Sequence, residues 1–455
     1  MYCQERKFFE FKNLSVCGTL LLALCGALAG QTAPPAAPSD GTAIERMAQR
    51  VEELQNELNQ LKEQIAKSRA TPEGATASPP AAASAGATVN PAEPPVAPAP
   101  PTEVQTDDDQ STSHKLGPFR MQGFSDITFG RPVFNVLPNG VLYTSTNSFS
   151  LGDFDLFVTA KLSDHLSYLA ELLITSDFTN QFSAELDRML LTYKFNDYLK
   201  VSAGKFNTAI GYYSNAFGRA RYFQTATGRP IMYTDEDDGG ILPVHSIGMT
   251  ATGKLPSGPL GLQWVAEIAN GRSSLSLSDT SGNTEDEQNF VDENNLKAVN
   301  FALIARPPAL QGFEVGVSFY RDHLRPTPFP DTSEHIPSAH IVFVRPRFEF
   351  LNEAALVQHA YIGEVGRQWN SLTAYTQLSR QFGHYRPYFR YDYQNVPKTE
   401  PFFGHDGQVG FAAGPSVGLR YDLADYAFLK FQYGRLLQRN VPWSNDFEIQ
   451  AAFAF

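Results

Sequence analysis

Apolar and polar residues alternate along most of the chain after Leu116, which is the period of a β-strand with two unlike faces. In residues 313–319, for example, Phe313, Val315 and Val317 lie on one face, and Glu314 and Ser318 lie on the other. The pattern predicts sixteen strands, at 119–130, 148–162, 165–174, 184–196, 198–205, 245–255, 260–269, 296–306, 313–323, 337–349, 354–364, 371–382, 385–394, 414–423, 426–437 and 446–455.

The connections between these strands alternate in length. Short ones follow even-numbered strands, as at 163–164, 196–197, 256–259, 383–384 and 424–425. Long ones follow odd-numbered strands, at 131–147, 206–244, 270–295, 324–336, 395–413 and 438–445. Short turns at one end and long loops at the other are typical of an outer-membrane barrel. We therefore predict an all-β fold: a sixteen-stranded antiparallel transmembrane β-barrel over residues 115–455.

The last strand places five apolar residues on one face, and it ends on an aromatic residue. These residues are Phe447, Ile449, Ala451, Phe453 and Phe455. The pattern resembles the C-terminal signal of bacterial outer-membrane barrels, which implies that Phe453 and Phe455 are read by the barrel assembly machinery. An ordinary amphipathic closing strand is the alternative interpretation.

The first 29 residues predict a secretory signal peptide. Basic residues precede an apolar run that ends in the small-x-small pattern Ala27-Leu28-Ala29. All three cysteines, Cys3, Cys17 and Cys25, lie in this segment, so the mature protein would contain none. Acylation of Cys25 as in a lipoprotein is the alternative, although Leu24 stands where a small residue is expected.

Between the signal peptide and the barrel we predict three segments. Residues 30–41 are rich in Pro and Ala and have a disordered character. Residues 42–67 carry the heptad pattern of an α-helical coiled coil. The alternative interpretation is a single amphipathic helix that packs on another part of the protein. The seam of the coiled coil, the predicted oligomerisation surface, consists of Ile44, Met47, Val51, Leu54, Leu58, Leu61 and Ile65. Residues 68–114 form a Pro/Ala-rich linker that cannot bury a core.

Composition agrees with a barrel and excludes some functions. The chain has 42% hydrophobic residues together with 34 Phe and 19 Tyr, which fits strands with only one apolar face, although a large soluble β-protein would fit as well. The net charge of −12 argues against nucleic acid as a partner. No constellation of a nucleophile with a nearby base and an orienting group stands out in the sequence, so we predict that the protein is not an enzyme, and no cofactor or metal is implied.

Charged residues that would face the lumen suggest where ions are selected. The connection 206–244 contains the candidate constriction residues Arg219, Arg221, Arg229, Asp235 and Asp237, which are equally compatible with a solvated loop. Further candidate pore-lining residues on the strands are Arg188, Lys194, Arg386, Arg390 and Arg420. The last three could form a basic track that binds anions. Anion preference and weak selectivity both remain open at this point.

The signal peptide, coiled coil, linker, alternating strands and terminal Phe455 together resemble trimeric porins, in particular the phosphate-selective porins of the OprO/OprP group and their DcaP-like relatives. The resemblance implies a homotrimer in the outer membrane, with the coiled coil in the periplasm and the third external loop folded into each pore. The expected partners are outer-membrane lipid, lipopolysaccharide, the assembly machinery and small hydrophilic or anionic solutes that diffuse passively. An envelope tether that acts through the coiled coil, or an adhesin that acts through the external loops, is the alternative function.

Overall fold

The computed structural model describes residues 114–116, 119–131, 135–136, 142–143, 147–176, 182–218, 222–234, 240–272, 292, 294–325, 330–403, 410–439 and 441–455. The predicted signal peptide, disordered segment and coiled coil, and all but the last residue of the predicted linker, lie outside the described residues.

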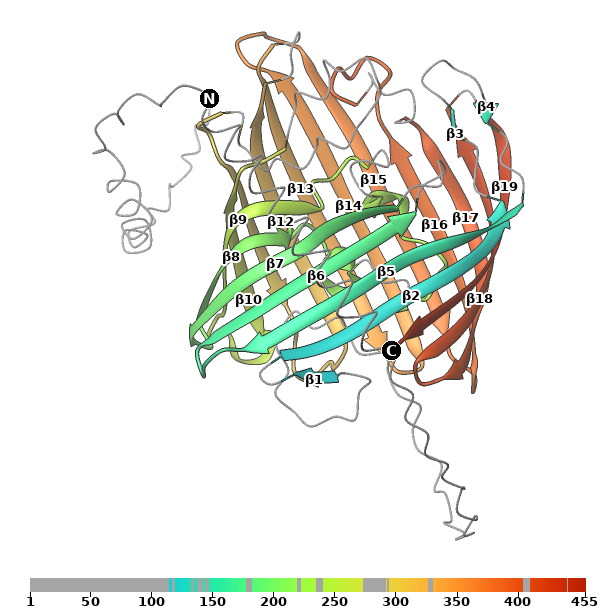
Figure 1. Ribbon diagram of the computed structural model, residues 1–455. Coiled ribbons are helices and arrows are strands. Elements are labelled where there is room, and N and C mark those ends of the chain that lie inside the picture. The colour runs from blue at the N-terminus through green and yellow to red at the C-terminus, as the bar shows by residue number, and fades with distance from the viewer. Residues whose placement is uncertain are drawn as a thin grey trace, which may run out of the picture. The chain divides into compact units, whose positions relative to one another are not determined.

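Sixteen antiparallel strands form a closed barrel (Figure 1). Each strand pairs with its neighbour in sequence, and the last strand pairs with the first to close the ring. The strands are β2 (Phe119–Arg131), β5 (Ser148–Lys161), β6 (Leu166–Ser176), β7 (Phe182–Asn196), β8 (Leu199–Asn207), β9 (His245–Lys254), β10 (Leu262–Ala269), β11 (Ala298–Ala305), β12 (Phe313–Leu324), β13 (Thr332–Arg345), β14 (Phe348–Tyr361), β15 (Gln368–Arg380), β16 (Tyr385–Asn395), β17 (Ala412–Ala424), β18 (Ala427–Gln438) and β19 (Val441–Ala454). The predicted fold class is confirmed.

A few short elements lie outside the ring. Strand β1 (His114–Leu116) pairs with β2, and β3 (Asn135–Val136) pairs with β4 (Leu142–Tyr143). The helical elements are α3 (Tyr213–Phe217), η1 (Ile231–Tyr233) and η3 (Gly258–Leu260). No helix among the described residues is long and apolar enough to cross a membrane.

The barrel wall has an apolar outer face and a polar, covered inner face. On β12 the outward residues Val317 and Phe319 are 55% and 50% exposed, whereas the inward residues Glu314 and Ser318 are 7% and 8% exposed. A soluble protein of one chain rarely exposes apolar side chains in such continuous rows. The outer surface is therefore suited to lipid, and the polar groups are turned inward.

Outward aromatic residues gather near both ends of the strands. Near one end, the exposed aromatic side chains include Phe195, Tyr198, Phe382, Tyr385 and Tyr426, and near the other they include Phe149, Phe182 and Trp443. Aromatic side chains favour the two membrane–water interfaces, because one part of the ring can be apolar while the rest is hydrated. The barrel thus carries two aromatic girdles.

The two ends of the barrel differ in their connections, as predicted. At the short-turn end the strands are joined by residues 162–165, 197–198, 255–261, 306–312, 346–347, 381–384 and 425–426. At the long-loop end the longest connections cover 132–147, 208–244, 270–297 and 396–411.

Three predicted connections were placed wrongly. The loop predicted at 324–336 is only 325–331, because β13 already begins at Thr332. The turn between β13 and β14 lies at 346–347, whereas the predicted strands 337–349 and 354–364 would place it at 350–353. The polar pair Asn352-Glu353 continues β14, because Asn352 faces outward and Glu353 faces the lumen. The predicted long loop at 438–445 is only the connection 439–440, since Gln438 is already paired with Val441.

The C-terminal residue takes part in closing the barrel. Phe455 and Gly123 of β2 exchange two backbone hydrogen bonds of 2.9 Å. The Phe455 ring lies over Gly123, where an added Cβ would be only 2.3 Å from the ring. Glycine therefore leaves room for the terminal aromatic side chain on the outer face, and Phe453 faces outward beside it with 6.3 Å between ring centroids.

Candidate pore constriction

The connection between β8 and β9, residues 208–244, folds into the lumen, and we call it the inward loop. It starts where the backbone amide of Ala209 donates to both carboxylate oxygens of Glu267 on β10, at 3.0 and 3.1 Å. Asn300 of β11 donates to the same carboxylate. A carboxylate on the wall thus turns the chain away from β8 and towards the barrel axis.

Glu353 on β14 is the central anchor of the inward loop. Its carboxylate accepts hydrogen bonds from the backbone amides of Tyr212 (2.5 Å) and Tyr213 (3.1 Å), at the start of α3. The hydroxyls of Tyr233 (2.7 Å) and Tyr375 (2.5 Å) donate to the same group. Burial and the Glu353 charge raise the pKa of the Tyr233 hydroxyl, which therefore stays protonated as a donor.

The approach of the loop to Glu353 requires a glycine. Gly211 has φ +75°, a left-handed conformation that side chains disfavour. A Cβ at this position would lie 2.0 Å from the Tyr233 hydroxyl oxygen and 2.4 Å from Glu353 Oε2. Any larger residue would therefore push the loop away from its anchor.

A second part of the loop is held from the wall formed by β14, β16, β18 and β19. The backbone carbonyls of Ala226, Thr227 and Gly228 accept hydrogen bonds from Lys430 Nζ (3.0 Å), Gln450 Nε2 (3.0 Å) and Arg390 Nη1 (2.6 Å), respectively. The hydroxyls of Thr225 and Thr227 donate to Glu349 and Glu448, respectively. The loop therefore bonds to several walls of the lumen, not to β8 and β9 alone.

The inward loop extends towards the short-turn end. The Tyr222 hydroxyl donates to the Asp425 carbonyl at 2.6 Å, and Asp425 lies in the turn between β17 and β18. Tyr222 and Phe223 pack against Phe124 of β2 and Phe428 of β18. Burial raises the pKa of the Tyr222 hydroxyl, which keeps its proton for this bond.

A buried ionic cluster holds three connections together near the long-loop end. His359 of β14 lies 2.7 Å from Glu334 through one ring nitrogen and 2.7 Å from Glu400 of the connection 396–411 through the other. Arg272, in the connection after β10, lies over the Phe403 ring and donates to the Ile241 carbonyl of the inward loop at 2.9 Å. These contacts join the inward loop to the connections after β10 and β16.

The structure brings together part of the predicted basic track. Arg386, Arg420 and Lys430 are register partners on β16, β17 and β18, and we call them the basic row. Arg386 donates to Gln381 and to the Pro346 carbonyl at 2.7 Å, and Arg420 pairs with Asp422 at 2.8 Å. Each cation is therefore already bonded to the barrel or the loop.

The other predicted residues are spread over the lumen. Arg390 pairs with Asp392 at 2.9 Å, and Arg188 pairs with Glu171 on β6. Lys194 pairs with Asp197 at 3.0 Å near the short-turn end, and Arg229 donates to Ser214 within the inward loop at 3.0 Å. The remaining loop candidates, Arg219, Arg221, Asp235 and Asp237, lie outside the described residues.

Sequence reasoning missed the groups that fix the loop: Glu353, Gln450 and Tyr222. The alternation of β19 does place Gln450 on the inward face, but nothing local distinguishes it from other inward polar residues. Among the described residues, no group of three or more His, Cys, Asp or Glu side chains is arranged to hold a metal ion. The arrangement is that of a lumen partly filled by a bonded loop.

No protein-family model matches the sequence, and a search of curated proteins gives no match. Solved structures with a similar arrangement include the outer membrane channel DcaP of Acinetobacter baumannii and an anion-selective porin from Comamonas acidovorans. Each has 11% sequence identity and a TM-score of 0.49, and the matches cover 74% of this chain and 97% and 99% of those chains. OprB of Pseudomonas putida has 10% identity and a TM-score of 0.48, with 74% of this chain and 93% of that chain covered. The predicted grouping with the OprO/OprP porins stays a prediction, and the lumen is interpreted from its own residues.

Proposed function

We propose that this protein is an outer-membrane porin that lets small hydrophilic solutes diffuse through a lumen narrowed by the inward loop. The observation that carries this proposal is the contrast between the two barrel faces, apolar with aromatic girdles outside and polar inside. A barrel that needed only to anchor the protein in lipid would require the outer face alone. The polar inner face and the bonded loop instead suit a water-filled passage of restricted width.

The basic row supports a modest preference for anions. Arg420 is neutralised by Asp422, but Arg386 donates to an amide and a backbone carbonyl, which leave its positive charge in place. The nearby pair Arg390–Asp392 adds no net charge. Glu349 and Glu448 also line this part of the lumen, so the proposed preference rests on the position of the cations in one row, because charged side chains that ring a narrow lumen decide which ions pass.

Assembly as a homotrimer belongs to the same proposal. The heptad at Ile44–Ile65 would associate in the periplasm, on a linker that leaves the barrel free to sit in the membrane. Three copies of the predicted helix would stabilise the assembly together with the barrels, because so short a coiled coil is marginal alone.

Planar-bilayer recording of the refolded full chain under a salt gradient tests the proposal. We expect single-channel steps that occur in groups of three, with a reversal potential displaced in the direction of anion permeation. A chain that inserts but never conducts would overturn the porin assignment and favour the tether. Conductance in single steps would contradict the trimer only.

A further inference from the structure

Two outward arginines and a phenylalanine form a row at the short-turn end. Arg345 of β13 is the register partner of Phe348 of β14, and Phe348 is the partner of Arg380 of β15. Adjacent strands lie about 4.8 Å apart, so the Cα atoms of the two arginines are separated by roughly 10 Å. Both side chains are exposed, and they flank Phe348 on the outer face.

The hydrogen-bonding capacity of these arginines is largely unused. Arg380 makes no hydrogen bond or ion pair through its guanidinium group within the described part of the chain. Arg345 donates through Nε to the Gln311 carbonyl at 2.7 Å, which leaves its other N–H donors available. The guanidinium groups of the inward arginines, in contrast, are paired with carboxylates or carbonyls.

Aromatic side chains hold the two cations at the level of the aromatic girdle. The Arg345 guanidinium lies 5.4 Å from the centre of the Phe343 ring, and that of Arg380 lies 5.2 Å from the Phe382 ring. Phe382 and Tyr385 are exposed beside them. Cations next to interfacial aromatic residues occupy the depth where lipid headgroups meet acyl chains.

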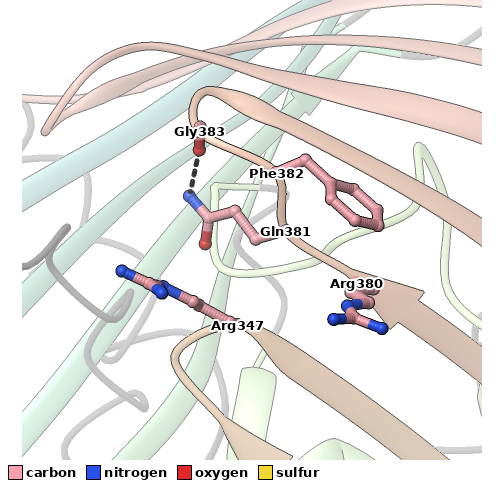
Figure 2. A pocket seen from close by; sticks show the side chains of 5 residues that line it. All are labelled: Arg347, Arg380, Gln381, Phe382 and Gly383. Atoms are coloured by element: carbon pink, nitrogen blue, oxygen red, sulfur yellow. Dashed lines mark hydrogen bonds between the residues drawn. The ribbon is translucent and has the colours of Figure 1, made fainter.

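A small surface pocket adjoins this row. It has a volume of about 360 Å³ and is lined by Arg347, Arg380, Gln381, Phe382 and Gly383, from the two neighbouring turns. Figure 2 shows the guanidinium groups of Arg347 and Arg380 on either side of the segment Gln381–Gly383. A 3.0 Å hydrogen bond from Gln381 Nε2 to the Gly383 carbonyl stabilises this segment. Arg347 therefore adds a third cation, which like Arg380 has no carboxylate partner among the described residues.

The other exposed lysines at this end lie beside carboxylates. Lys161 pairs with Asp164 at 3.0 Å, and Lys254 lies 3.9 Å from Asp197, which also binds Lys194. Hydrogen bonds from Lys161 and Lys194 lower the pKa values of Asp164 and Asp197, respectively, so both acids are ionised counter-charges. Arg345, Arg347 and Arg380, in contrast, have no carboxylate partner among the described residues.

We propose that Arg345 and Arg380 bind the phosphate of an anionic phospholipid in the leaflet at the short-turn end. The planar guanidinium forks would hold the phosphate oxygens, and Phe348 and Phe382 would contact the start of the acyl chains. This inference rests on the membrane placement in the proposed function, and it adds a lipid site outside the pore.

Binding of phosphatidylglycerol to the full chain, measured by native mass spectrometry in detergent, tests this proposal. The double variant R345Q/R380Q should bind phosphatidylglycerol roughly fivefold more weakly for each arginine removed. The matched control K161Q/K254Q removes the same charge at the same end, but from lysines near carboxylates, and should bind as the parent does. Equal retention by both double variants would overturn the proposal.

Two further measurements identify the ligand and keep the inference separate from the pore. An excess of inorganic phosphate should leave the bound lipid in place. Displacement of the lipid by phosphate would overturn the lipid assignment and indicate a site for a soluble anion. Because both arginines face outward, R345Q/R380Q should conduct like the parent channel in bilayers. Loss of lipid binding with normal conductance therefore supports the lipid site, whereas a parent chain that fails to conduct contradicts the porin proposal alone.

Discussion

The outer and inner faces of the same strands are stabilised in different ways. On β12, Val317 and Phe319 face outward and depend on no partner, because any lipid tail can cover them. On β14, Glu353 faces inward and depends on specific partners more than a hundred residues away in sequence, at Tyr212, Tyr213 and Tyr233. The outer face thus requires only apolar side chains, whereas the inner face requires particular hydrogen-bond partners. A substitution on the outer face should therefore be assessed by the polarity it introduces, and one on the inner face by the hydrogen bonds it removes.

The largest effect should follow from a charge on the outer face. Val317→Arg places a guanidinium group in the middle of the apolar band, which should lower the free energy of unfolding by about 2–4 kcal/mol. Thr250 faces the lumen and is half-buried, so Thr250→Arg is the matched inward control. Urea unfolding in lipid vesicles measures both values. Equal destabilisation by the two changes would contradict the assignment of the faces.

The next effect concerns the anchor of the inward loop. Glu353→Gln removes the charge that four donors share, which should cost roughly 1.5–3 kcal/mol and raise single-channel conductance as the loop loosens. Glu314 is also buried and faces inward, but it accepts from the wall residues Arg306 (2.7 Å) and His340 (3.2 Å). Glu314→Gln should therefore destabilise the barrel without raising conductance. An unchanged conductance in the Glu353 variant would show that Glu353 does not position the constriction.

A smaller effect on the same anchor is expected from glycine substitution. Gly211→Ala forces a side chain into a left-handed conformation, at a cost of about 1–2 kcal/mol, and also displaces Tyr233 and Glu353. Gly363 has a similar φ of +85°, but no atom lies within 4 Å of its added Cβ. Gly363→Ala is therefore a control for backbone strain alone. Only Gly211→Ala should increase conductance or current noise in bilayer recordings.

The smallest expected effect is a change in ion selectivity when charges of the basic row are removed. Arg386→Gln and Lys430→Gln remove two of the three charges of the basic row and should shift the reversal potential towards cation permeation, because Glu349 and Glu448 remain in the same part of the lumen. Lys194→Gln removes a cation that already pairs with Asp197 and should have little effect. A reversal potential that stays unchanged in the double variant would exclude the basic row as the source of anion preference.

The sequence predicted the barrel because alternation and turn length are local signals. Strand β16 was placed within one residue, since Tyr385, Phe389 and Tyr391 alternate with Arg386 and Arg390. The β13–β14 turn was missed because Asn352-Glu353 looks like a turn, although both residues are satisfied on opposite faces of a strand. Pro346 and Arg347 form the connection instead.

The sequence predicted that a long loop forms the constriction, but not which wall residues hold that loop. Its length and its position after β8 were evident in the sequence, but its partners were not. Lys430, Gln450 and Arg390 meet consecutive carbonyls of the loop, although they lie 162 to 223 residues away along the chain. The register between β16 and β17 also decides that Arg386 and Arg420 are neighbours, and a shift of one residue would have placed their side chains on opposite faces.

The most direct test is to modify the inward loop in a conducting channel. Ile231 is a half-buried loop residue, and Ile231→Cys would be the sole cysteine once Cys3, Cys17 and Cys25 are replaced by serine. A bulky thiol reagent added during bilayer recording should reduce the current of this variant. The same reagent should leave unchanged the current of a control with the cysteine at Gly258 in a short turn, where an added Cβ has no atom within 4 Å. A modified Ile231→Cys channel with undiminished current would contradict the central claim that the inward loop narrows the path.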